Sequence, residues 1–132
     1  MSQRKVAIIA ANGGMDAAYK VLNIATAAAS MDAEVTVFFT FEGLKLIHQQ
    51  AYGNLALPAG MAGLQESFQA NNVPTVPALV AMAQELGVKF IACQMTMDLM
   101  GVAQEQLVEG IEVGGAATFL AFAFDADVTL TF

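Results

Sequence analysis

The stretch VKFIAC at residues 88–93, which runs directly into QMTMDLMG at residues 94–101, decides the fold of this chain. Its apolar, aromatic and β-branched residues predict a buried strand. We expect a helix to begin immediately after it. In parallel α/β proteins the functional site opens beyond the carboxyl ends of the strands. Cys93 stands at such an end, and we expect it on a central strand.

Cys93 is the only cysteine among the 132 residues. At a strand end its thiol would be partly accessible, and the N–H groups and dipole of a following helix would lower its pKa. The alternative is a small buried hydrophobic residue, which is how free cysteines usually behave. Position alone leaves both interpretations open. A single cysteine excludes an internal disulfide within these residues. Few cysteines and no disulfide are typical of proteins in a reducing cytoplasm, where we expect this protein to be located.

Runs with strand character alternate with runs of helical periodicity along the chain. The expected strands cover residues 5–11, 34–40, 88–93, 111–113 and 127–132, and the expected helices cover residues 15–31, a short stretch after 41–43, 78–86, 102–109 and 116–124. This alternation predicts a mostly parallel sheet of about five strands with helices on both faces, a three-layer α/β/α fold. No repeat, linker or low-complexity tract divides the chain, so we expect residues 1–132 to form a single domain.

The periodicity weakens in an insert from Tyr52 to Val73. Gly53, Pro58 and two further glycines interrupt it, while apolar residues recur throughout. We expect part loop and part irregular helix, lying over the Cys93 opening as a lid or in a subunit contact, and more mobile than the sheet.

The composition is apolar and acidic. Hydrophobic residues make up 57% of the chain and charged residues 13%, against a usual charged share of about 25%. With so few charged residues, some apolar side chains should remain on the surface of the folded chain. We therefore expect a homo-oligomer, in which another subunit covers them. A net charge of −7 with only five Lys and Arg argues against nucleic-acid binding. No apolar run reaches the roughly 18 residues of a membrane span, and the N-terminal residues are typical of a first strand rather than a signal peptide.

Four residues are candidates to support Cys93. Thr96 and Asp98 fit the cap or first turn of the expected helix. Asp98 would oppose thiolate formation if it pointed at the sulfur, and it is a possible acid or base. The backbone N–H groups of Gly114 and Gly115 would help stabilise an anion if they point toward Cys93.

The remaining motifs are weaker signals. His48 is the only histidine and thus the only residue able to form a Cys–His pair, although we favour a structural role for it. One cysteine and one histidine make a metal site improbable. Gly13-Gly14 follows the first expected strand but lacks the spacing of a phosphate-binding loop, which favours a tight turn. We expect no cofactor.

Four segments carry a resemblance to a known family. They are residues 41–48, 73–77, 87–101 and 107–120. They closely resemble the DsrE/DsrF/DsrH-like family, in particular its small stand-alone branch, sometimes labelled peroxiredoxin-like. The resemblance implies a flavodoxin-like domain that assembles into trimers or hexamers. It also implies a cysteine, here Cys93, that carries sulfur as a persulfide and exchanges it with small sulfur-carrier proteins and rhodanese-type donors.

Two departures from the family pattern matter. The central insert is short and lacks the basic residues often found in relatives, and no second cysteine is present to act as a resolving thiol. The leading hypothesis is a sulfur carrier or sulfurtransferase that acts through Cys93 with partner proteins. The alternative is an oligomeric module that binds a small ligand without covalent chemistry. A peroxide-reducing thiol enzyme is a third, weaker hypothesis, because it would need an external reductant.

Overall fold

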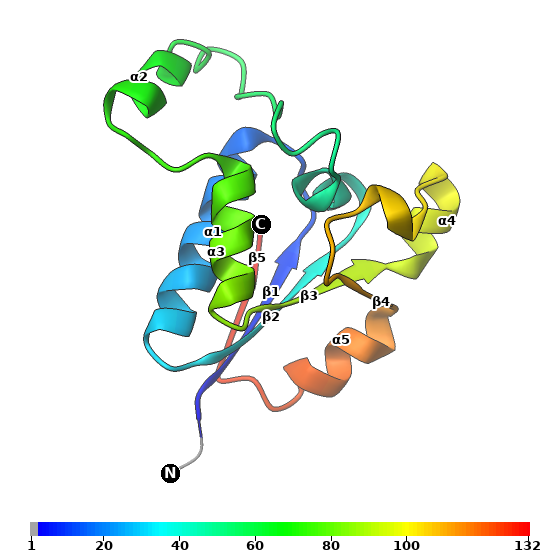
Figure 1. Ribbon diagram of the computed structural model, residues 1–132. Coiled ribbons are helices and arrows are strands. Elements are labelled where there is room, and N and C mark those ends of the chain that lie inside the picture. The colour runs from blue at the N-terminus through cyan, green and yellow to red at the C-terminus, as the bar shows by residue number, and fades with distance from the viewer. Residues whose placement is uncertain (1–2) are drawn as a thin grey trace.

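The computed structural model describes residues 3–132, which form one parallel sheet of five strands in the order β4-β3-β2-β1-β5 (Figure 1). The strands are β1 (Lys5–Ala10), β2 (Glu34–Phe39), β3 (Lys89–Cys93), β4 (Glu112–Gly114) and β5 (Val128–Thr131). Since all these strand pairs are parallel, the carboxyl ends share one edge of the sheet. β3 is an interior strand that ends at Cys93, whereas β5 is an edge strand.

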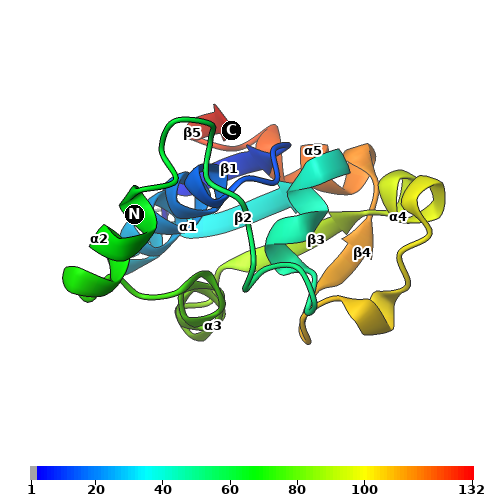
Figure 2. The ribbon, with the colours of Figure 1, turned by 90° about the horizontal axis from the view of Figure 1, so that it is seen from above.

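Helices form the two outer layers (Figures 1 and 2): α1 and α3 pack together over one face of the sheet, and α5 covers the other. The helices are α1 (Met15–Ser30), α2 (Leu64–Ala70), α3 (Val76–Glu85), α4 (Gln94–Met100) and α5 (Ala116–Ala123), with the 3-10 helices η1 (Phe41–Ile47) and η2 (Gln104–Gln106). The predicted three-layer α/β fold is confirmed. Within residues 3–132, no helix is both long enough and apolar enough to cross a bilayer.

The buried residues fall into two clusters, because successive residues of a strand point to opposite faces. The cluster beneath α1 and α3 includes Ile8, Val37, Phe39 and Phe90. The smaller cluster beneath α5 consists of Ala7, Phe38, Ile91, Cys93 and Phe119. The Cys93 side chain therefore lies on the α5 face of the sheet.

The helix expected over residues 102–109 is wrong. Only the three residues of η2 are helical there. The backbone of the following residues pairs with the end of η1 instead: His48 and Leu107 form an antiparallel bridge, and the Val108 N–H donates to the Ile47 carbonyl at 2.9 Å. Because the backbone groups of Leu107 and Val108 are bonded to the end of η1, they cannot form the hydrogen bonds of a helix.

The helix expected over residues 78–86 begins two residues earlier, at Val76. Thr75 is its N-cap, and the Thr75 hydroxyl accepts a hydrogen bond from the Ala78 N–H at 3.2 Å. Pro77 fits in the first turn, where its missing N–H costs nothing. Gly87 follows the end of this helix, and its φ of 87° lies in the left-handed region that favours glycine.

The insert does not cover Cys93, so the lid predicted there is wrong. Its apolar residues Tyr52, Leu55 and Phe68 pack against the cluster beneath α1 and α3, on the opposite face from the Cys93 side chain. The Phe68 ring stacks on Tyr19 of α1 with centroids 4.8 Å apart. These apolar contacts and the aromatic stacking hold the insert on the α1 face of the sheet.

Gly43 allows η1 to approach β1 closely, and we predict that Gly43→Ala destabilises the fold. The Cβ of an alanine would collide with the Ala10 carbonyl, which is backbone and cannot rotate away. We expect the free energy of unfolding in urea to fall by about 1–3 kcal/mol, the usual cost of overpacking. Gly63→Ala is the control, because its Cβ would meet no atom within 4 Å. Equal stability of the two variants would contradict this packing argument.

Candidate functional site

Cys93 stands where β3 passes into α4 without an intervening loop. It is the last residue of the strand and the N-cap residue of the helix. Its side chain packs with Phe38, Ile91 and Phe119, and the residue is only 5% exposed. The expectation that Cys93 is partly accessible is therefore wrong for the isolated chain, because α5 places Phe119 in the smaller buried cluster with it.

Hydrogen bonds favour the anionic form of the Cys93 thiol. Burial alone raises the pKa of this thiol. Hydrogen bonds from the side chain and backbone of Thr96, the side chain of Thr40 and the backbone of Met95 lower it, and together they outweigh burial. The pKa of Cys93 consequently lies below its ordinary value, which favours the thiolate, the reactive form of cysteine.

Thr96 links three segments around the sulfur. It is fully buried, and its Oγ1 accepts a hydrogen bond from the Phe41 N–H at 3.0 Å and lies 3.3 Å from Thr40 Oγ1. Because the Phe41 N–H occupies one lone pair of Thr96 Oγ1, the Thr96 hydroxyl proton remains available for donation. Thr96 lies in the first turn of α4 as predicted, but its side chain does not cap the helix.

Phe41 adopts a strained backbone conformation beside Cys93. Its φ of 49° lies in the left-handed region, where a residue other than glycine costs about 1–3 kcal/mol. This turn directs the Phe41 N–H toward Thr96. Sequence reasoning missed Thr40 and Phe41. The signal was available in principle, because they follow a strand that ends at the same edge as β3.

Gly114 lies beside Cys93, since the two residues are partners in the parallel register of β3 and β4. A Cβ at Gly114 would meet the Thr118 side chain at 2.8 Å, so close packing against α5 accounts for this glycine. The Gly115 N–H donates to Thr118 Oγ1 at 3.2 Å. That amide is therefore engaged within the start of α5.

Asp98 and His48 make their contacts elsewhere. Asp98 is the fifth residue of α4, beyond the predicted first turn, because the helix starts directly after Cys93; its exposed carboxylate accepts from Gln94 Nε2 at 3.0 Å. The His48 Nδ1 accepts from the Gln50 N–H at 3.2 Å, and its backbone pairs with Leu107. Neither residue is among the groups that hydrogen-bond the Cys93 sulfur.

Exposed apolar side chains lie along the segments that hold Cys93. They are Phe41, Met95, Leu99 and Met100, each at least 45% exposed. We call these four residues the apolar rim. Met95 and Leu99 are four residues apart and so share one face of α4. Large exposed apolar side chains of this kind are typical of protein interaction sites. For the residues that the structure describes, no group of three or more His, Cys, Asp or Glu side chains is arranged to hold a metal ion.

Fold and site together define a parallel α/β protein with a hydrogen-bonded cysteine at the carboxyl edge of its sheet. The profile of the DsrE/DsrF/DrsH-like family matches this sequence over residues 2–59 and 57–131. The chain belongs to this family, as the sequence resemblance predicted.

Two relatives resemble the chain over nearly its whole length, and one solved structure shares its fold. The chain is 36% identical to the sulfur carrier protein DsrE2 of Allochromatium vinosum, over 98% of this chain and 99% of DsrE2. It is 32% identical to the uncharacterized protein YrkE of Bacillus subtilis, over 96% of each chain. The crystal structure of the YchN protein from E. coli has the same fold, with a TM-score of 0.71 at 17% identity over 98% of this chain and all of YchN.

We predict that Thr96→Val raises the pKa of Cys93. The substitution removes the hydroxyl that hydrogen-bonds the sulfur and leaves the Phe41 N–H without its acceptor, which should also cost about 1–3 kcal/mol of stability. The rate of Cys93 alkylation, measured against pH, should reach its midpoint at higher pH than in the wild type. Thr26→Val is the control, because Thr26 Oγ1 bonds only carbonyls of α1.

The same variant should change how stability depends on pH. Because the folded-state pKa of Cys93 is lowered, its ionisation stabilises the fold above the unfolded-state pKa, and this contribution is lost as pH falls through the folded-state pKa. Thr96→Val should therefore lose more stability at alkaline than at acidic pH. An unchanged alkylation midpoint would contradict the role assigned to Thr96.

Proposed function

We propose that this protein is a sulfur carrier that binds sulfane sulfur as a persulfide on Cys93 and passes it to the thiol of a partner protein. The observation that carries the proposal is the place of Cys93 at the junction of β3 and α4, where the linked hydroxyls of Thr40 and Thr96 meet. The pKa of the Cys93 thiol is lowered there, which favours an anionic sulfur. The name of the relative DsrE2, a sulfur carrier aligned over nearly the whole chain, supports it.

The chemistry is two sulfur transfers without net oxidation. In loading, the Cys93 thiolate attacks the outer sulfur of a donor persulfide; a new bond forms to Cys93 Sγ, the donor S–S bond breaks, and the donor leaves as a thiol after taking up the proton of the outer sulfur. In unloading, an acceptor thiolate attacks the outer sulfur and Cys93 leaves as a thiolate. A lowered pKa supports both steps, since it supplies the thiolate and makes it a better leaving group.

Burial of Cys93 gives the carrier protection. At 5% exposure, the sulfur is shielded from water and small oxidants, and with one cysteine in the chain a bound sulfur cannot be released by an internal disulfide. Loading requires Phe119 of α5 to move away from the Cys93 sulfur, a motion that also admits small donors. We propose that a sulfur-carrier protein or rhodanese-type donor docks on the apolar rim to deliver its sulfur there. We also propose that the protein forms a homo-oligomer, and the resemblance to the family implies a trimer. We further propose that it works in a reducing cytoplasm.

The second candidate function is the one that the sequence left open. It is an oligomeric module that holds a small ligand near Cys93 without covalent chemistry. The two functions differ in whether a stable sulfur adduct forms on the protein.

We predict that incubation with a sulfane-sulfur donor, such as polysulfide or a loaded rhodanese, adds about 32 Da to the protein, the mass of one sulfur atom in a persulfide. Intact-mass spectrometry should show this adduct in the wild type, and a reducing thiol should remove it. Cys93→Ser should abolish the adduct but keep the circular dichroism spectrum and assembly of the wild type. If no donor produces the adduct, the ligand-binding function replaces this proposal.

We predict that Leu99→Asp slows sulfur exchange with a protein partner but not with a small donor. Leu99 is 68% exposed on the apolar rim, and a charge there would disrupt docking at a cost of about tenfold in transfer rate, as at an interface hot spot. Loading from inorganic polysulfide should keep its wild-type rate. Met31→Asp is the matched control, since Met31 is 73% exposed at the far end of α1. Equal slowing by both variants would contradict docking on the rim.

A further inference from the structure

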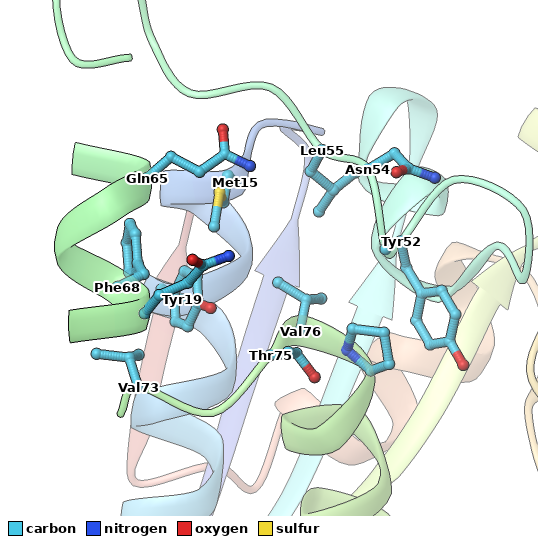
Figure 3. Close-up of a pocket in the computed structure, with 13 residues that line it drawn as sticks. Met15, Tyr19, Tyr52, Asn54, Leu55, Gln65, Phe68, Val73, Thr75 and Val76 are labelled. Carbon is cyan, nitrogen blue, oxygen red and sulfur yellow. The ribbon is translucent and has the colours of Figure 1, made fainter. Parts of the chain in front are cut away.

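A cavity of about 390 Å³ lies outside the Cys93 site, between the insert and the helices α1 and α3 (Figure 3). Its size is within the usual range of small-molecule sites. It belongs to the face of the sheet that α1 and α3 cover, whereas the Cys93 side chain lies on the α5 face. The sulfur-carrier function therefore makes no use of it.

One wall of the cavity is apolar and well anchored. Tyr19 and Phe68 stack there, and the Tyr19 hydroxyl donates to the Pro74 carbonyl at 2.8 Å. The Met15 N–H donates to the Ala56 carbonyl at 2.8 Å, which ties the loop over the cavity to the start of α1. These bonds hold both sides of the cavity in place before any ligand arrives.

The polar side chains that line the cavity are uncharged. They are the amides Asn54, Gln65 and Gln69 and the hydroxyl-bearing Tyr19, Tyr52 and Thr75, and none of the described residues in the lining is Asp, Glu, Lys, Arg or His. Figure 3 shows Gln65 reaching from α2 over Met15, with Asn54 on the other side of the opening. Among residues 3–132, no protein group hydrogen-bonds the side-chain amides of these three residues. Each amide therefore offers a ligand both a donor and an acceptor.

We infer that this cavity is a second binding site, for a small uncharged molecule with a ring and a polar group. The ring would pack against the wall of Tyr19 and Phe68, and the polar group would bond the amides of Gln65 and Asn54. A charged ligand is disfavoured because the lining has no counter-ion to offset its loss of water.

The loop at the edge of the cavity lies where the match to the family profile is split into two segments. The two matched segments overlap at residues 57–59, close in sequence to the lining residues Asn54 and Leu55. The alignment with DsrE2 runs over 158 positions but covers 98% of a 132-residue chain, so DsrE2 contains residues that this chain lacks. The division of the profile match at residues 57–59 points to this loop as the place of the difference.

The test uses benzamide, benzoate and benzamidinium, which share one ring and differ in charge. Methyl spectra of methionine-labelled protein locate the binding, because Met15 lines the cavity while Met95 lies in the first turn of α4, next to Cys93. Benzamide should shift the Met15 methyl and leave Met95 unchanged, and both charged probes should bind at least about tenfold more weakly. No Met15 shift with benzamide, equal binding of all three probes, or a shift at Met95 instead would overturn the inference.

Two variants of α2 complete the test. Gln65→Trp should fill the cavity and abolish the Met15 shift, whereas Ala70→Trp, at an exposed position of the same helix outside the lining, should keep it. Retained binding in Gln65→Trp would overturn the inference. Cys93→Ser should bind benzamide as the wild type does, which separates this site from the sulfur chemistry.

Discussion

The parallel pairing of β2 with β3 is the constraint on which the rest of the site depends. With Phe39 opposite Ala92, both strands end at the same level, and the residues that follow them meet. Thr40 is thereby brought to the Cys93 sulfur, and Phe41 to Thr96. A shift of one residue in this register would turn Cys93 and its neighbours to the opposite face of the sheet.

The Cys93 site resolves a conflict between burial and ionisation. Burial in an apolar cluster disfavours a thiolate, yet the Thr96 and Thr40 hydroxyls and two backbone N–H groups reverse that preference. The backbone strain at Phe41 belongs to the same arrangement, because its left-handed turn directs an N–H at Thr96 Oγ1. A buried but hydrogen-bonded sulfur suits a carrier, which must keep its cargo until a partner arrives.

The sheet also separates two environments. Side chains of β3 alternate, so that Phe90 joins the large cluster under α1 and α3, whereas Ile91 and Cys93 join the small one under α5. The insert adds its aromatic residues to the first face and forms a neutral cavity there. Because the sheet lies between the two, a ligand in the cavity and a sulfur on Cys93 would not compete for the same space.

The sequence by itself determined the alternation of strands and helices, the position of Cys93 at a strand end and the membership of the family. These features depend on local periodicity and on residues that are neighbours in the chain. Only the tertiary structure decided that Thr40 and Phe41 join the site, that the Gly115 N–H bonds Thr118 and that the insert packs on α1. The backbone of residues 106–108 likewise formed a bridge to η1 instead of a helix. Strand order and long-range pairing govern all of these contacts, and neither can be read from residues that are close in sequence.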